Sequence, residues 1–149
     1  MPAIEVKSVD NLLGTPVGYG YAVKAGPWIF LTGHEAFDFG AGVPEEVAGP
    51  SGFPFYGASR SRREGDFILQ RMRRILREMG ANLVNAVRLD QYYPTPKAVH
   101  PYHLARHAAF GDYIPPSTSV VMERIFGGGS TISTGPSSTP RKWIPTWCR

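Results

Sequence analysis

The segment Ile114–Phe126 constrains the fold of this 149-residue chain more than any other. Pro115 and Pro116 force an extended backbone and cannot continue the helical pattern that precedes them. Ser117–Phe126 is then typical of a β-strand, and three glycines at 127–129 supply a turn. A helix, an extended proline pair, a strand and a glycine turn in succession indicate a domain that packs helices against a sheet.

The rest of the chain adds a hairpin, two helices and further strands. We expect a hairpin over Ala22–Gly33 that turns at Gly26-Pro27, a helix over Gly65–Met79, a strand over Asn85–Tyr93, a helix from Pro101 to Phe110, and a return strand over Ser130–Thr134. The first helix carries apolar residues at helical spacing (Ile68, Met72, Ile75, Leu76 and Met79). The unbroken run Trp28–Thr32 predicts a strand buried on both faces.

This order predicts an α+β fold, a mixed β-sheet with two helices packed on one face. The other face would be bare, and the simplest cover for it is a second copy of the chain. Residues 35–63, rich in Gly, Pro and aromatics, are expected to form a long irregular loop. Residues 1–134 are expected to be a single domain. The atypical tail, 135–149, has three prolines, which should bar it from a central strand.

Composition narrows the class of protein. A hydrophobic share of 42% and a charged share of 19% are typical of a globular protein. No apolar run approaches the ~20 residues that span a membrane, and the first residues do not resemble a signal peptide. With Cys148 as the single cysteine, these features predict a cytoplasmic protein without an internal disulfide. The net charge of +4 is concentrated partly in Arg60–Arg77, interpreted as a solvated helix face rather than a phosphate-binding patch.

Five segments together resemble the RidA (YjgF-like) family. They are Pro16–Lys24, Thr32–His34, Gly80–Val87, Tyr102–Phe110 and Pro115–Arg124. The resemblance covers roughly residues 15–134. It implies a homotrimer of chorismate-mutase-like subunits that handles small imines and related reactive metabolites. It also implies clefts between subunits that need no metal or cofactor.

The resemblance carries over to individual residues. Tyr19 matches the cleft tyrosine, and His103 falls near a polar helix residue that lines the cleft. Ser117 stands where deaminating members place an arginine, and Thr131–Thr134 lacks their glutamate. Because serine offers one neutral hydrogen bond where arginine offers two parallel ones, simple 2-iminoacids should be held poorly. In that case only Arg88 or Arg124 could replace the missing arginine.

Further candidates come from residue type and position. The candidate catalytic residues are His34, His103 and Glu123, and the candidate substrate-binding residues are Tyr19, Tyr92, Ser117, Thr118 and Arg124. Each has a plainer alternative. Ser117 and Thr118 could be ordinary strand residues, His103 a surface or interface histidine, and Glu123 with Arg124 an intersubunit salt bridge. Tyr19 and Tyr92, with Phe53 and Phe55, could belong to the core packing. Glu35 could partner His34. His100, His103 and His107 recur at helical spacing, but no cysteine or acid completes a metal site.

These observations favour a cofactor-free hydrolase or deaminase that acts on a small imine, enamine or related conjugated metabolite. The alternative is a non-catalytic metabolite-binding trimer of the same fold. An endoribonuclease ranks below both, because the arginines at 71–77 are not interleaved with the aromatic side chains that RNA binding favours.

Overall fold

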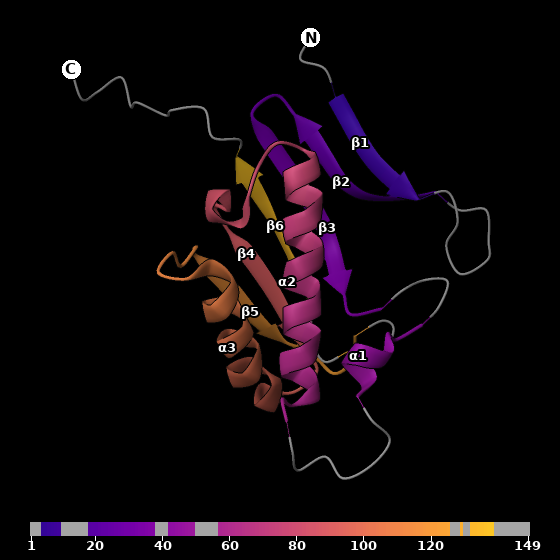
Figure 1. Ribbon diagram of the computed structural model, residues 1–149, viewed down its shortest axis with the longest axis vertical. Helices are drawn as coiled ribbons and strands as arrows, with labels where there is room; N and C mark the ends of the chain where they lie inside the picture. Colours follow the sequence, from indigo (N-terminus) through magenta and orange to yellow (C-terminus); the bar gives the residue numbers. More distant parts are fainter. Residues whose placement is uncertain are drawn as a thin grey trace.

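The computed structural model of the chain describes residues 4–9, 18–37, 42–49, 57–125, 129 and 132–138. Within them, six strands form one sheet, and helices α2 and α3 cover one of its faces (Figure 1). Across the sheet the strands run β1 (Ile4–Val9), β2 (Tyr19–Ala25), β3 (Trp28–Glu35), β6 (Ile132–Ser138), β4 (Leu89–Tyr93) and β5 (Ser117–Val121). Only β4 and β5 pair in parallel. The predicted α+β architecture with a mixed sheet is confirmed.

The hairpin of β2 and β3 turns where the sequence predicted. Gly26 takes a φ of +60°, which suits a residue without a Cβ. The expectation that Trp28–Thr32 is buried on both faces was wrong for a single chain. Ile29 and Leu31 are buried, but Trp28 and Phe30 remain 41% and 49% exposed. The reason is that helices cover only one face of the sheet, so alternate residues of β3 face away from them.

Helix α2 (Arg60–Glu78) begins five residues earlier than expected. The Ser59 side chain accepts a hydrogen bond from the backbone N–H of Arg62 and so caps the start of the helix. Gly80, with a φ of +79°, follows its end. The expected long loop is therefore shorter, and it contains a one-turn helix, α1 (Glu45–Ala48). Residues 38–41 and 50–56, which include Phe53 and Phe55, lie outside the described residues.

Helix α3 (Val99–Phe110) packs beside α2 and places its apolar stripe on the core (Figure 1). Tyr102, Ala105 and Phe110 are buried, as their spacing predicted. The two helices approach closely at Gly65, where an added Cβ would lie 2.9 Å from both Ala105 Cβ and Tyr102 Cδ2. The core also holds Ile29, Leu31, Ile68, Leu69, Met72, Leu76, Leu83, Leu89 and Tyr93. A short 3₁₀ turn, η2 (Pro96–Ala98), leads into α3.

Strands β4 and β5 are shorter than predicted. β4 begins at Leu89 rather than Asn85, because Asn82 and Asn85 cap a 3₁₀ turn, η1 (Leu83–Asn85). β5 ends at Val121 rather than Phe126. Among the described residues its strand partner is β4, which ends at Tyr93 just before Pro94. The backbone N–H of Met122 donates to the carbonyl of Tyr93 at the end of this pairing.

Strand β6 contradicts the expectation that prolines bar residues beyond 134 from a central strand. Pro136 lies within β6, between β3 and β4, opposite Phe30. The pairing with β4 extends only to Thr134. Beyond that point β6 has a described neighbour on one side only, so a residue without an N–H is tolerated there. Residues 139–149 lie outside the described residues.

The uncovered face of the sheet is apolar over β1, β2 and β3. Direct partners in the register share a face, so Val6 lies in line with Val23 and Phe30, and Ile4 lies in line with Ala25 and Trp28. Ile4, Val6, Trp28 and Phe30 are each at least 41% exposed. We call these four residues the open-face patch. A contiguous apolar patch of this kind typically marks an interaction surface.

Candidate functional site

Two of the predicted site residues, His103 and Ser117, meet in a groove between α3 and the start of β5. The groove encloses about 660 Å³. The imidazoles of His100, His103 and His107, one turn apart on α3, line one side of it. Apolar residues complete it, namely Leu104, Phe110, Tyr113, Ile114, Pro115 and Pro116. We call this space the α3–β5 groove.

Arg106 also lines this groove, although it was not among the predicted site residues. Its side chain extends from α3 to the strand: Nη1 donates to Ser117 Oγ at 2.8 Å, and Nη2 donates to the carbonyl of Pro115. The residue is only 6% exposed, and none of the described residues hydrogen-bonds its Nε. Among the described residues, no carboxylate lies within salt-bridge distance of it. A guanidinium therefore lies beside the position at which the resembled family carries its arginine.

Helical spacing could have predicted the burial of Arg106. Tyr102 belongs to the apolar stripe of α3, and a residue four positions later lies on the same helix face. The contact with Ser117 could not have been predicted in that way, because it depends on how α3 packs over β5. Arg88 and Arg124 were the predicted replacements for the missing arginine.

His103 lies on the groove side of α3 with an exposed side chain. Partial burial lowers the pKa of His103 below its ordinary value, and the positive charge of Arg106 and then His100 lower it further. The imidazole is therefore neutral at neutral pH. A neutral imidazole has one nitrogen free to accept a proton, which general base catalysis requires.

Thr118 and Arg88 belong to the opposite face of the sheet. Ser117 pairs with the buried Leu89 beneath the helices, so the next residue along the strand faces away from them. Arg88 Nη2 donates to Thr118 Oγ1 at 3.3 Å, and Arg88 Nε donates to Asp90 Oδ1 at 2.9 Å. Within one protomer, Thr118 and Arg88 therefore do not share the α3–β5 groove with Ser117.

Tyr19 is far from the groove of its own protomer. Its hydroxyl donates to the carbonyl of Gly33 at 3.1 Å, which fixes it against β3. Three strands, β3, β6 and β4, separate β2 from β5. At ~4.8 Å per strand, the two are about 19 Å apart. Tyr19 and Ser117 of one chain cannot contact the same small ligand, so a shared site needs Tyr19 from a neighbouring subunit.

His34 lies in a separate buried cluster beneath α2. It is 3% exposed, and its Nε2 has no hydrogen-bond partner within the described part of the chain. Burial lowers the pKa of His34 to about 4, and the charge of Arg71 contributes. Burial also raises the pKa of Glu35 to about 7, with a further contribution from Glu64. Glu35 Oε2 also has no hydrogen-bond partner among the described residues, and it is therefore not bonded to His34 Nε2.

The remaining candidates are dispersed. Tyr92 is half-buried on β4, and Glu123 and Arg124 are exposed beyond the end of β5. No three His, Cys, Asp or Glu side chains in the described part of the chain lie together as a metal site. None of the helices within the described ranges has the length and apolarity that a membrane span requires.

Most arginines of α2 serve the fold. Arg60 and Arg62 pair with Glu64 and Asp66 one turn later. Three others donate to backbone carbonyls of neighbouring segments: Arg63 to Val47, Ala48 and Ala58, Arg71 to Glu35 and Phe37, and Arg73 to Ala109. Arg74 and Arg77 are exposed. The expected solvated face is thus limited to part of the basic run.

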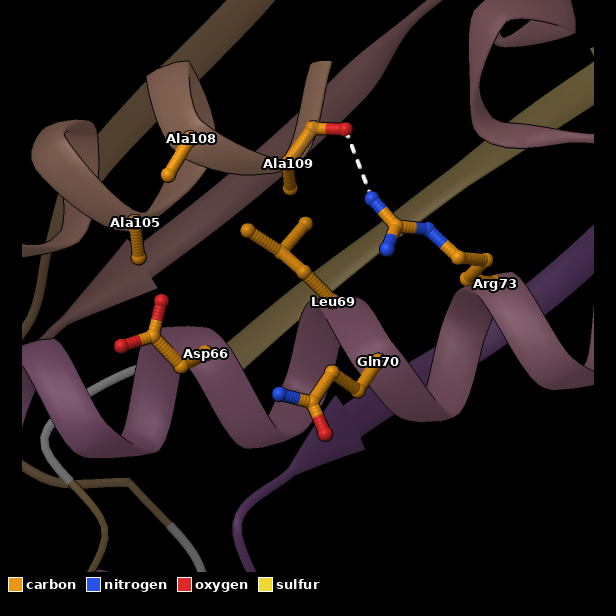
Figure 2. A pocket seen from close by; sticks show the side chains of 7 residues that line it. All are labelled: Asp66, Leu69, Gln70, Arg73, Ala105, Ala108 and Ala109. Carbon is orange, nitrogen blue, oxygen red and sulfur yellow. Dashed lines mark hydrogen bonds between the residues drawn. The ribbon is translucent and has the colours of Figure 1, made fainter. Parts of the chain in front are cut away.

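A second, smaller groove of about 170 Å³ lies between α2 and α3 (Figure 2). Figure 2 shows the guanidinium of Arg73 directed at the carbonyl of Ala109, with a nitrogen–oxygen distance of 2.8 Å. The carboxylate of Asp66 lines the same groove.

Solved structures resemble the fold closely. A putative endoribonuclease from Klebsiella pneumoniae superposes with a TM-score of 0.70 at 20% identity, over 82% of this chain and 100% of that one. A member of the YjgF/YER057c/UK114 family from Mycobacterium tuberculosis gives 0.69 at 19% identity, over 92% and 100%. RidA from an Antarctic Psychrobacter gives 0.64 at 18% identity, over 80% and 87%.

The chain has the RidA fold. The resemblance inferred from the five sequence segments is therefore confirmed at the level of fold. No family model matches the sequence, and no curated protein matches it. Because one fold hosts many reactions, the activity has to be argued from the residues of the site.

Proposed function

We propose that this RidA-like chain is a cofactor-free hydrolase or deaminase that acts on a small imine, enamine or related conjugated metabolite. One observation carries the proposal: a neutral imidazole, His103, and a buried guanidinium, Arg106, line one groove together with Ser117. The fold supports it, because its solved relatives include a protein named RidA.

The groove supplies the groups that imine hydrolysis needs. Water adds to the carbon of the C=N bond, His103 accepts the water proton, and the nitrogen is protonated. Collapse of the resulting carbinolamine breaks the C–N bond and releases ammonia and a carbonyl product. Arg106 holds a negatively charged part of the substrate, so that the C=N carbon stays within reach of the water that His103 activates.

The site would be completed in a homotrimer. The open-face patch (Ile4, Val6, Trp28 and Phe30) provides an apolar surface that a neighbouring subunit can cover. A site that includes Tyr19 needs the Tyr19 of one subunit to reach the α3–β5 groove of the next, because the two cannot meet within a chain. The cleft between subunits is thus part of the proposal.

A panel of imines and enamines, generated in the assay and followed by ammonia release, tests the activity. We expect accelerated release with at least one substrate, and a loss of about 10²-fold or more in His103→Gln, since that is the usual contribution of a general base. Gln70→Ala, on the exposed side of α2, is the control and should behave like wild type. Equal rates for His103→Gln and wild type would contradict the assigned role.

The alternative is a binding protein with the same groove but no turnover. It is favoured by the composition of the groove, because no Asp or Glu is among the described residues that line it. Ligand binding without accelerated ammonia release across the panel would decide for it. An endoribonuclease is less well supported, because five of the seven arginines of α2 are engaged in ion pairs or hydrogen bonds to backbone carbonyls.

A further inference from the structure

Three of the four histidines of the chain lie on one exposed side of α3. His100, His103 and His107 line the α3–β5 groove, and all three are exposed. The proposed function uses only His103. Within the described part of the chain, no hydrogen bond or ion pair engages the imidazole of His103 or His107. Both rings are therefore available to a ligand from solution.

The spacing of these histidines selects one pair. His103 and His107 are four residues apart, so they lie on the same face of the helix, with Cβ atoms about 6 Å apart. Two histidines at this spacing on a helix can bind one metal ion, as they do in zinc proteases. Ala105 and Arg106, which lie between them in the sequence, are buried, so neither stands between the two rings. His100 is about 10 Å from His107 along the helix axis, which is too far for both to bind the same ion.

The available donor atoms decide which ions fit. No carboxylate or thiol is among the described residues that line the groove, and no three potential metal ligands of the described residues lie together. Water must therefore complete the coordination, which makes the ion exchangeable rather than a resident cofactor. Imidazole nitrogens favour Cu²⁺, Ni²⁺ and Zn²⁺ over Mg²⁺ and Ca²⁺, and Cu²⁺ binds such sites most tightly. The positive charge of Arg106 in the same groove opposes any cation, so the ion with the strongest bonds to imidazole is favoured further.

We propose that His103 and His107 form a surface site for one divalent transition-metal ion, with Cu²⁺ preferred, and that the bound ion inhibits the protein. A neutral imidazole has a single free nitrogen lone pair, and a bound ion occupies it. His103 could then no longer act as the base that activates water. The inhibition rests on the proposed function, whereas the metal site does not.

Calorimetric titration of the full chain with CuCl₂ tests the metal site. We expect saturable binding of one ion per chain, tighter for Cu²⁺ than for NiCl₂ or ZnCl₂. His103→Gln and His107→Gln should each weaken Cu²⁺ binding by at least about tenfold, the lower end of what even an outer-shell partner contributes to a metal site. The matched control His100→Gln should keep the wild-type affinity. Cys148→Ser should also keep it, which separates the site from binding by the thiol.

Three results would overturn the site: no saturable Cu²⁺ binding by wild type, equal affinity of wild type and His107→Gln, or a loss in His100→Gln or Cys148→Ser as large as that in His107→Gln. Inhibition is measured separately, on an imine that wild type hydrolyses. There His107→Gln should need at least about tenfold more Cu²⁺ than wild type for half-inhibition. Full activity of the Cu²⁺-loaded protein would refute the inhibition. A protein that binds Cu²⁺ but hydrolyses no imine would count against the proposed function and leave the metal site in place.

Discussion

Replacing Glu35 by glutamine should make the folded protein more stable at alkaline pH. Glu35 lies at the end of β3, and burial together with the neighbouring Glu64 raises the pKa of Glu35 from 4.5 to about 7. Between these two values the folded state holds a proton that the unfolded chain has released. Stability therefore falls as pH rises from about 4.5 to about 7, and the loss is complete above that range.

The size of the effect follows from the gap between the two pKa values. Without solvent screening, this pKa difference corresponds to about 3 kcal/mol of stability, since one pKa unit is worth about 1.4 kcal/mol. The carboxyl is only half-buried, so solvent screening should reduce the effect to about 1–2 kcal/mol. His34 gives the opposite pH dependence of stability. The pKa of His34 is lowered to about 4, so its contribution to stability is lost as pH falls from 6.5 toward that value. The difference between Glu35→Gln and wild type isolates Glu35.

Urea unfolding at pH 4, 5.5, 7 and 8.5, at one fixed protein concentration, measures this difference. We expect the two proteins to be equally stable at pH 4 and the variant to be about 1–2 kcal/mol more stable at pH 8.5. Glu78→Gln, at an exposed position of α2, is the control and should follow wild type throughout. A constant difference between Glu35→Gln and wild type at every pH would refute the reasoning.

Two further predictions concern packing. In denaturant unfolding, Gly65→Ala should destabilise the protein by about 1–2 kcal/mol despite the better helix propensity of alanine, because the added Cβ would lie 2.9 Å from Ala105 and Tyr102. The control Gly18→Ala, whose Cβ meets nothing within 4 Å, should be neutral, and equal unfolding midpoints for the two variants would contradict the close helix contact. Phe30→Glu in the open-face patch should give monomers by light scattering at micromolar concentration with an unchanged circular dichroism spectrum, and persistence of the oligomer would exclude this face as the interface.

The sequence predicted the fold best where local patterns decide structure. Helical spacing identified the buried side chains of α2 and α3, and Gly26 and Gly80 marked a turn and a helix end. Strand ends were less predictable, because they depend on the partner strand: β5 stops where Pro94 ends its neighbour, and Pro136 is accepted where β4 no longer pairs with β6. These limits are set by tertiary structure, which no local pattern contains.

The candidate site was predicted only in part for the same reason. His103 and Ser117 were identified from the resemblance, and the structure brings them to one groove. Arg106 was missed because its role arises from the packing of α3 over β5, although its spacing from Tyr102 indicates burial. His34 was assigned to the same site because it ends a strand, yet its side chain lies beneath α2, near Arg71.

The central claim is that the site is assembled between subunits. A crystal structure of the assembled protein tests it through the distance from the Tyr19 hydroxyl of one subunit to Ser117 Oγ and the Arg106 guanidinium of its neighbour. The account predicts a trimer in which these groups lie within about 10 Å of each other, as groups that share one small ligand must. A monomer, or a trimer in which no copy of Tyr19 comes within that distance of Ser117, would contradict it.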